Sequence, residues 1–281
     1  MINDKIGIAV ITCNREDTFR KCLQSLPIVD HIVVVNDGSP YPQDAYDSLR
    51  KYPSSQLIQH PRNTSVATSK NDGLRSMIAA GCTHLFLCED DIEVLDPNVC
   101  NRYIEAAAAS GIWHLNYALS SKINRDKDGK PKPVQQIDYD ERNTISFYEH
   151  IVGSWSYFHA SVIKHIGLFD ERYINAMEHV EHTYRAILQQ LHPPYWWFAD
   201  VADSDKLLAD QDIDLTNSVI RKSLNWEHNF RHACLLFMHK HGMLPTAVAK
   251  TEPQAALEQI EKLHTYYKRD DIKQFYANLR S

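Results

Sequence analysis

The sequence predicts an α/β fold built on a doubly wound, mostly parallel sheet, with a helical extension at its C-terminal end. Short β-branched runs suited to buried strands occur at 6–12 (IGIAVIT) and 31–36 (HIVVVN). Segments with apolar residues at helical spacing separate such runs. Strand and helix alternate in this way over about 110 residues, which is the pattern of a parallel sheet covered by helices on both faces.

The other elements of this first half follow in order. Pro27 ends the first helix, whose apolar residues fall at helical spacing. Two further strands are expected at 56–60 and 83–88, with a helix at 66–80 between them. Pro97 opens a later helix that extends to residue 110. The residues that indicate the first helix are Phe19, Cys22, Leu23 and Leu26.

The C-terminal part is predicted to be mostly helical. A strand follows a turn within 192–205, helices are expected within 217–242, and 252–280 has the spacing of an amphipathic helical pair. We therefore divide the chain into a domain at 1–216 and a helical extension at 217–281. The extension is expected to pack on the domain, while dimerisation and contact with a membrane surface are the alternatives.

The composition is that of an ordinary globular protein, with 43% hydrophobic and 23% charged residues. The net charge of −6 argues against nucleic acid as a general partner. The apolar run at 6–11 fits neither a membrane span nor a signal peptide, so we expect a cytoplasmic protein. The six cysteines form no CxxC pair, which favours buried thiols over disulfides or a zinc site.

Three consecutive acids, Glu89, Asp90 and Asp91, directly follow the strand expected at 83–88. Ligands of open α/β sheets bind at the carboxyl ends of the strands, so this cluster lies where a site is expected. Crowded carboxylates stay ionised at low cost only where a cation joins them. Oxygen ligands suit Mg²⁺ or Mn²⁺, which take their remaining ligands from substrate phosphates and water. The alternative is a solvated acidic turn before the next helix.

Polar residues follow the other strand ends as well. Asp37 lies in a turn after the second strand, where it could bind a base or ribose edge or merely stabilise an Asx turn. Cationic and amide side chains stand around the start of the helix at 66–80, a position suited to phosphate. They are Arg62, Asn63, Lys70 and Asn71. Neither a G-x-G-x-x-G nor a P-loop motif is present.

The order of these motifs resembles that of glycosyltransferase family 2, inverting enzymes of the GT-A fold that use nucleotide sugars. The resemblance covers about residues 6–200, and Ser65 and Lys70 replace a glycine and an arginine that are usual in the family. The segments that carry it are VITCNRED (10–17), VNDGS (35–39), RNTSVATSKNDG (62–73), EDD (89–91), IGLFDERY (166–173) and EHVEHTYR (178–185).

The resemblance implies a site for a nucleotide sugar and a divalent ion, Mn²⁺ or Mg²⁺. Glu89 and Asp91 would hold the ion, and a histidine, His182 or His228, would be a further metal ligand. The nucleobase and ribose would lie against the first two strand ends, with Asp37 on a uracil imide. The donor-binding residues implied in this way are Thr12, Asn14, Arg15, Asp37, Arg62, Asn63, Lys70, Asn71 and Asp90.

His179 stands where the family has the aspartate that acts as catalytic base. An imidazole or a carboxylate can take the proton of an acceptor hydroxyl, so Glu178 and Glu181 are alternatives. A helix at 178–191 would turn an apolar side to the core and a polar side, with Glu178, away from it. The apolar side carries Val180, Tyr184, Ile187 and Leu188, and the polar side also carries His182 and Arg185.

The implied reaction moves a hexose or N-acetylhexosamine, with inversion, from a nucleotide sugar to a hydroxyl of a glycan or lipid-linked glycan. The expected nucleotide is UDP, and the expected role is bacterial surface polysaccharide synthesis, with peripheral contact to the inner face of the membrane. A nucleotidyltransferase is an alternative, although the G-x-G-T-R loop of that class is absent after the first strand. The altered base position also permits a non-catalytic nucleotide-sugar-binding protein.

Overall fold

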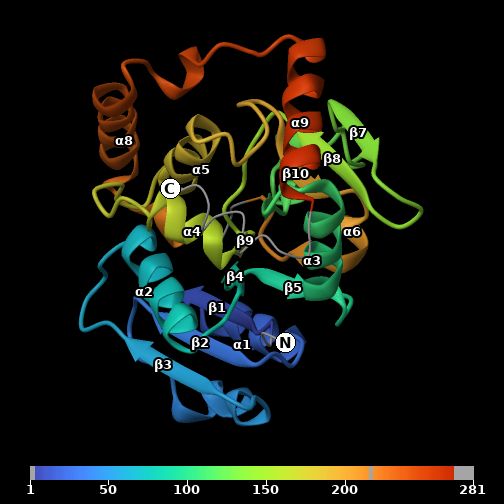
Figure 1. Ribbon diagram of the computed structural model, residues 1–281. Helices are drawn as coiled ribbons and strands as arrows, with labels where there is room; N and C mark the ends of the chain where they lie inside the picture. Colours follow the sequence, from blue (N-terminus) through green and yellow to red (C-terminus); the bar gives the residue numbers. More distant parts are fainter. Residues whose placement is uncertain (1–3, 215–217, 269–281) are drawn as a thin grey trace.

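The computed structural model describes residues 4–214 and 218–268. Within them, a central six-stranded sheet has the order β3-β2-β1-β4-β9-β6 (Figure 1). The first four strands in this order are parallel, whereas β9 runs antiparallel to both of its neighbours. The strands are β1 Ile6–Thr12, β2 His31–Asn36, β3 Ser55–Gln59, β4 His84–Glu89, β6 His114–Asn116 and β9 Trp155–His159.

Helices cover both faces of this sheet. Helix α2 (Val66–Ala79) lies so close to β1 that a Cβ added at Gly73 would meet the Ala9 Cβ at 2.6 Å. On the other face, α1 (Glu16–Ser25) places Cys22 Sγ 3.6 Å from Cys88 Sγ. Leu87, which faces α2, and Cys88 point to opposite sides because successive strand residues alternate. The predicted doubly wound arrangement is therefore confirmed.

Two smaller sheets adjoin the central one. One has the order β10-β8-β7, and the other pairs β11 with β5 in antiparallel fashion. In the second pair Asp210 lies opposite Ile92, which brings the end of β11 beside the acids that follow β4. Their bounds are β5 Ile92–Val94, β7 Gln135–Asp138, β8 Thr144–Tyr148, β10 Phe198–Val201 and β11 Leu208–Asp210.

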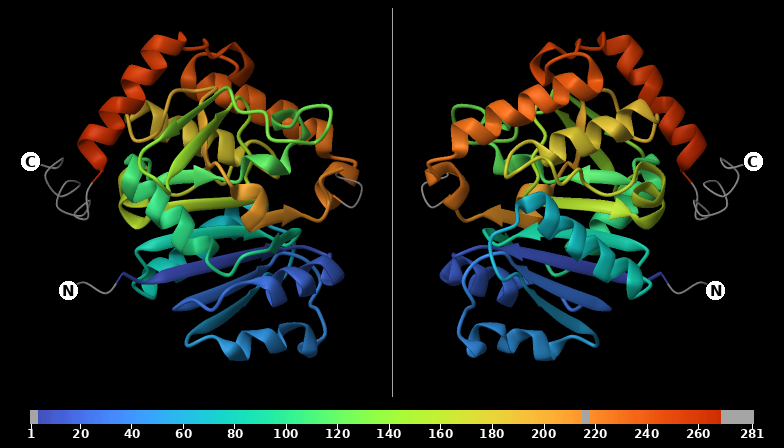
Figure 2. Two further views of the ribbon diagram at one scale, coloured as in Figure 1. Left: turned by 90° about the vertical axis from the view of Figure 1, so that its right-hand side faces the viewer. Right: turned by 90° about the vertical axis from the view of Figure 1, so that its left-hand side faces the viewer.

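Helices α5, α8 and α9 of the C-terminal half lie on the side of the molecule opposite the N-terminal strands (Figure 2). Helix α8 packs on α5, with the rings of Phe237 and Tyr184 5.0 Å apart. Helix α9 packs near α3, and the Trp113 indole donates a 2.9 Å hydrogen bond to the Tyr267 carbonyl. The helices are α3 Val99–Ser110, α4 Ala160–Ile166, α5 Glu178–Leu188, α6 Ser204–Leu207, α7 Val219–Lys222, α8 Trp226–His241 and α9 Pro253–Tyr267.

Short 3₁₀ helices link several of these elements. They are η1 Gln43–Lys51, η2 Ala118–Ser120, η3 Lys122–Asn124 and η4 Pro245–Ala247. No helix within 4–214 or 218–268 combines the length and the apolar character needed to cross a membrane.

The predicted elements agree with the structure to within a few residues in the first half, and the differences lie in the second. The strand expected within 192–205 begins only at Phe198, because Trp196 has a φ of 73° and interrupts extended backbone. The predicted division at 216 and the end of the helical pair at 252–280 lie outside the described residues.

The predicted faces of α5 are wrong for its polar side and for Leu188, whereas Tyr184 of the predicted core side is buried as expected. Glu178 and His182, expected on the outer side, are 4% and 0% exposed, whereas Leu188, expected in the core, is 55% exposed. The physical reason is that cations from other elements meet the acidic side of this helix. Lys70 pairs with Glu178, and Lys240 pairs with Glu181, so the charged side is buried as well.

Candidate active site

A cavity of about 450 Å³ opens where the acids after β4 face the start of α5. Glu89 and Asp91 line one wall, and Glu178 and His179 line another. Asp210 reaches it from the end of β11, and Trp226 from the start of α8. Two groups of site residues that lie about 90 positions apart in the sequence thus meet in one cavity. Other lining residues include Lys122, Gly153, Ser154, Asn175 and Arg221.

Arg15 holds the acids that follow β4. Its guanidinium pairs with Asp90 and, at 2.9 Å, with Asp91, and it lies 3.7 Å from Asp212. Asp90 is 1% exposed and also accepts a 2.6 Å hydrogen bond from the Thr12 hydroxyl. Adjacent buried carboxylates require such a counter-cation, since both would otherwise be charged in a poorly solvated place.

The surroundings make these acids weaker than usual. Burial raises the pKa of Asp90 to about 7, with a further increase from Asp91 and an opposing effect of Arg15. Burial also raises the pKa of Asp91, and Arg15 again opposes it. The pKa of Asp210 is raised to about 6 by burial and by the nearby charge of Asp91. Protonation in this cluster is therefore sensitive to pH near neutrality.

Asp91 is suited to a divalent cation. Its Oδ1 is buried and has no hydrogen-bond partner, and the residue lines the cavity. Within 4–214 and 218–268, no group of three or more His, Cys, Asp or Glu side chains could hold a metal by itself. A site with one or two carboxylates still fits Mg²⁺ or Mn²⁺, which take other ligands from phosphate and water. Glu89, the second predicted ligand, pairs with Lys70 at 2.9 Å.

The structure does not bring the two predicted histidine ligands to this cavity. His182 is 0% exposed, stacks on Phe169 with 4.1 Å between ring centroids, and contacts the Gly167 carbonyl through Nε2. Burial lowers the pKa of His182 to about 3, which favours a neutral core imidazole. His228 is exposed on α8, two residues after the cavity-lining Trp226, and does not itself line the cavity.

Lys70 joins the two walls of the cavity. Its ammonium, 1% exposed, lies 2.9 Å from Glu89 and 3.0 Å from Glu178 and donates to the Gly153 carbonyl at 3.1 Å. Burial would lower the pKa of Lys70, but the two glutamates outweigh it and raise the pKa above its usual range. Lys70 is therefore a charged structural bridge beneath the cavity, and Asn71 beside it holds the backbone of Phe169.

Glu178 and His179 form a pair on the cavity wall. His179 Nδ1 lies 3.2 Å from Glu178 Oε1. Burial would raise the pKa of Glu178, but Lys70 and His179 outweigh it and hold the pKa below its usual range. The ionised carboxylate can only accept, so His179 Nδ1 carries the proton of this bond. His179 Nε2 is then the basic nitrogen.

Glu181, the third predicted base, lies elsewhere. It is 0% exposed and is absent from the cavity wall. Arg185 and Lys240 pair with its two oxygens at 3.1 and 2.7 Å, and His241 lies 3.3 Å away. Its contacts join α5 to α8, so the geometry gives Glu181 a structural role rather than access to a substrate.

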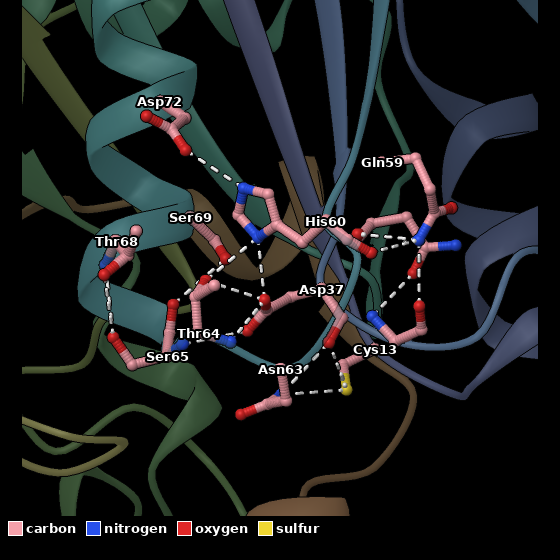
Figure 3. Close-up of polar contacts among 12 residues, drawn as sticks. Cys13, Asp37, Gln59, His60, Asn63, Thr64, Ser65, Thr68, Ser69 and Asp72 are labelled. Carbon is pink, nitrogen blue, oxygen red and sulfur yellow. Dashed lines mark hydrogen bonds and ion pairs between the residues drawn. The ribbon is translucent and has the colours of Figure 1, made fainter.

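Asp37 is the centre of a hydrogen-bond network at the end of β2 (Figure 3). Its carboxylate accepts from His60 Nδ1 at 2.7 Å, from the Thr64 amide at 2.7 Å and from the Ser65 amide at 3.0 Å. His60 is held from its other side by Asp72, with Nε2 3.0 Å away. This network fixes the loop before α2, and Asp37 is 3% exposed.

Three further predicted donor-binding residues, Asn14, Arg62 and Asn63, lie in or beside this loop. Asn14, with a φ of 55°, accepts a 2.8 Å bond from the Ser39 amide, and any Cβ at Gly38 would lie 2.5 Å from Asn14 Oδ1. Gly38 is therefore required for the close approach of the two turns. Asn63 donates to the Asp37 carbonyl at 3.1 Å, and Arg62 is exposed.

Three residues of this region were not predicted from the sequence. Tyr41 accepts a hydrogen bond from the Arg15 amide and bonds to Thr12, and Asp210 and Asp212 approach the acids after β4. A recognisable pattern existed for the two acids, because ADQDID at 209–214 repeats the spacing of a D-x-D motif. Its position next to Asp91 follows only from the pairing of β11 with β5.

Comparisons with known proteins identify the family and the fold. The model of glycosyl transferase family 2 matches residues 7–162, more than half of the chain. The chain belongs to glycosyl transferase family 2. The match ends before α5, so the Glu178–His179 pair lies beyond it.

Solved structures show the same GT-A glycosyltransferase fold. Residues 1–349 of S. aureus TarS align with a TM-score of 0.50 and 14% identity, over 98% of this chain and 91% of that one. GalNAc-T7, solved with UDP, GalNAc and Mn²⁺, aligns with a TM-score of 0.56 and 12% identity, over 98% of this chain and 56% of that one. No curated protein matches the chain.

Proposed function

We propose that this glycosyltransferase moves a sugar from a UDP-linked donor to a hydroxyl of a glycan or lipid-linked glycan, with inversion and with a divalent ion. The observation that supports this proposal is the cavity itself. Its lining includes both Asp91, a carboxylate with a buried oxygen that has no partner, and His179, a histidine oriented by a glutamate. A metal-dependent inverting transfer uses both features, one beside the leaving diphosphate and one beside the attacking hydroxyl.

The proposed transfer is a single displacement. The acceptor hydroxyl gives its proton to His179 Nε2 as its oxygen bonds to the anomeric carbon of the donor. The bond from that carbon to the phosphate oxygen breaks, and its electron pair leaves with UDP. Glu178 acts through His179, because it fixes the ring and stabilises the imidazolium that forms.

Asp91 and Glu89 are the proposed residues for holding Mn²⁺ or Mg²⁺, with Asp90 close to the donor. When bound there, the ion would offset the negative charge that develops on the departing diphosphate. The proposed pocket for uridine consists of the turns after β1 and β2, with Thr12, Asn14 and Asp37. The preformed network of Asp37 supports this part, since a rigid loop loses little freedom when a ligand binds.

The biological setting is also a proposal. Synthesis of a bacterial surface polysaccharide in the cytoplasm, with peripheral membrane contact, would bring the enzyme to a lipid-linked acceptor. Seven of the exposed large apolar residues lie close together in the sequence around α7 and α8, which supports a surface contact there. They are Val219, Leu224, Phe230, Leu235, Met238, Met243 and Leu244.

A thermal-shift series with UDP, GDP, CMP and TDP sugars, each with and without Mn²⁺, tests the donor and the metal. We expect UDP sugars with Mn²⁺ to raise the melting temperature most. Asp91→Ala should lose the metal-dependent part of the shift and keep the folded state. An equal shift for every nucleotide, with or without Mn²⁺, would contradict the proposed donor site.

Product analysis then separates the proposed enzyme from the two alternatives. Slow release of UDP from a UDP sugar that depends on His179 supports a transferase. Consumption of a nucleoside triphosphate with a sugar phosphate would instead identify a nucleotidyltransferase. Tight donor binding with no turnover, in the presence of a range of glycan acceptors, would identify a non-catalytic binding protein.

A further inference from the structure

We propose that Arg15 is a built-in counter-cation of the metal site, and that a divalent ion binds at Asp91 only by displacing the Arg15 guanidinium from it. This inference rests on the proposed function, because it concerns the ion that the donor would bring. It differs from a role for Arg15 in binding the nucleobase. It also predicts how the protein behaves when no nucleotide is present.

The two carboxylate oxygens of Asp91 have different surroundings, and this difference supports the proposal. Oδ2 accepts from Arg15 Nη1 at 2.9 Å, while Oδ1 is buried and has no partner. An ion at Oδ1 would lie on the same carboxyl group as the guanidinium, and the two cations would repel each other at short range. Asp91 can therefore serve Arg15 or a divalent ion, but not both at full strength.

Two other carboxylates can pair with the Arg15 guanidinium after it leaves Asp91. It already pairs with Asp90, and Asp212 lies 3.7 Å from Nη1. Its backbone is held in place, since its amide donates a 2.9 Å hydrogen bond to the Tyr41 hydroxyl. The guanidinium can thus turn from Asp91 towards Asp212 by side-chain rotation, without any movement of α1.

The pairing of Arg15 with Asp91 also affects how the metal and the nucleotide bind together. Without a donor, Arg15 satisfies the acids, and little is gained by exchanging it for a hydrated ion. The diphosphate of a donor supplies further oxygen ligands to the ion and an anionic partner to the released guanidinium. Metal and nucleotide should therefore bind cooperatively, and removal of the Arg15 charge should weaken that coupling.

A titration with Mn²⁺ tests the proposal without any turnover. The electron paramagnetic resonance signal of free Mn²⁺ decreases as the ion binds, and this decrease gives the affinity. In the absence of nucleotide, Arg15→Gln should bind Mn²⁺ at least about ten-fold more tightly than the unchanged protein. Arg20→Gln is the matched control, because Arg20 lies on α1, which begins directly after Arg15, and pairs with Glu16 and Asp44 near the surface. This control should bind Mn²⁺ like the unchanged protein.

Two further variants locate the effect and guard against misfolding. Adding Asp91→Asn to Arg15→Gln should remove the gain in Mn²⁺ affinity. If Arg15→Gln alone does not fold, Arg15→Gln with Asp90→Asn removes one buried charge of each sign and should still tighten Mn²⁺ binding. Mn²⁺ binding by folded Arg15→Gln, or by its combination with Asp90→Asn where the single variant does not fold, that is equal to or weaker than that of the unchanged protein would overturn the proposal.

The test is independent of the transfer reaction. Tighter Mn²⁺ binding by Arg15→Gln would support the displacement even if no UDP sugar were turned over. Turnover of a UDP sugar with unchanged Mn²⁺ binding in Arg15→Gln would support the proposed function and reject the displacement. The two proposals can therefore fail separately.

Discussion

Glu178 and Glu181 lie three residues apart on α5, are both buried, and are both paired with cations, yet they belong to two different regions of the molecule. Glu178 faces the cavity and shares its carboxylate between Lys70 and His179. Glu181 faces the interface with α8 and is enclosed by Arg185, Lys240 and His241. Residue type and burial alone therefore do not identify a reacting group.

The two glutamates differ in whether their partners leave a reactive group available in the cavity. Around Glu181, Arg185, Lys240 and the His241 ring complete an interface, and Glu181 does not line the cavity. Around Glu178, the partner His179 keeps one ring nitrogen available on the cavity wall. The following predictions test whether the first region is catalytic and the second structural, from the largest expected effect to the smallest.

Lys70→Met should cause the largest loss of stability. It would leave Glu89 and Glu178 without their shared cation, and removing one partner of a buried ion pair typically costs about 3–5 kcal/mol. Urea unfolding followed by circular dichroism measures this loss. Lys21→Met, at an exposed position of α1, is the control and should change the free energy of unfolding by less than about 1 kcal/mol. Similar values for both variants would show that the buried bridge is not important.

His179→Gln should lower the rate of sugar transfer by about 10²–10⁴-fold and leave the melting temperature nearly unchanged, because a general base contributes to rate rather than to folding. UDP release at saturating donor gives the rate. His228→Gln serves as the comparison, since His228 is exposed and does not line the cavity. A large loss with His228→Gln and none with His179→Gln would reverse the assignment.

Glu181→Gln should destabilise the protein by about 2 kcal/mol and preserve kcat, because it removes a charge from the α5–α8 interface and not from the cavity. Parallel measurement of the unfolding free energy and of UDP release separates the two effects. If kcat fell as steeply as with His179→Gln, Glu181 would be a direct participant and the distinction between the two regions would fail.

Glu178→Gln should show a smaller, pH-dependent change in stability. The folded protein holds the pKa of Glu178 below its ordinary value of 4.5, so the ionised group stabilises the fold above that pH and loses this effect as the pH falls. The difference in unfolding free energy between Glu178→Gln and the unchanged protein should therefore shrink by on the order of 1 kcal/mol from pH 7 to pH 4. Chemical denaturation at both pH values measures it, and a difference that is independent of pH would contradict the charged bridge.

Much of the fold was predictable from local pattern. The β-branched runs at 6–12 and 31–36 form buried parallel strands, and Pro97 marks the approach to α3. The acids after β4 were also expected at a ligand-binding edge, since the carboxyl end of a parallel strand is a property of chain direction. These features depend on residues that are close in the sequence.

The buried side of α5 was not predictable in the same way. Its spacing of apolar residues favoured a core side with Leu188, but Lys70 and Lys240 come from distant elements and draw the acids inward. A helical pattern cannot reveal such partners, because the favourable energy of burying a charge depends on a cation elsewhere in the chain. The burial of His182 was not predictable from the helical pattern either, because it depends on stacking with Phe169, which lies in another segment.

The sequence by itself determined the alternation of strands and helices, the position of the acids at a strand end and the family to which the chain belongs. Those properties arise from local spacing and from the order of motifs along the chain. Only the tertiary structure decided that Arg15 holds Asp91, that His179 faces the cavity and that Glu181 does not. These choices depend on contacts between residues far apart in the sequence, whose charges acquire their roles only when folding brings them together.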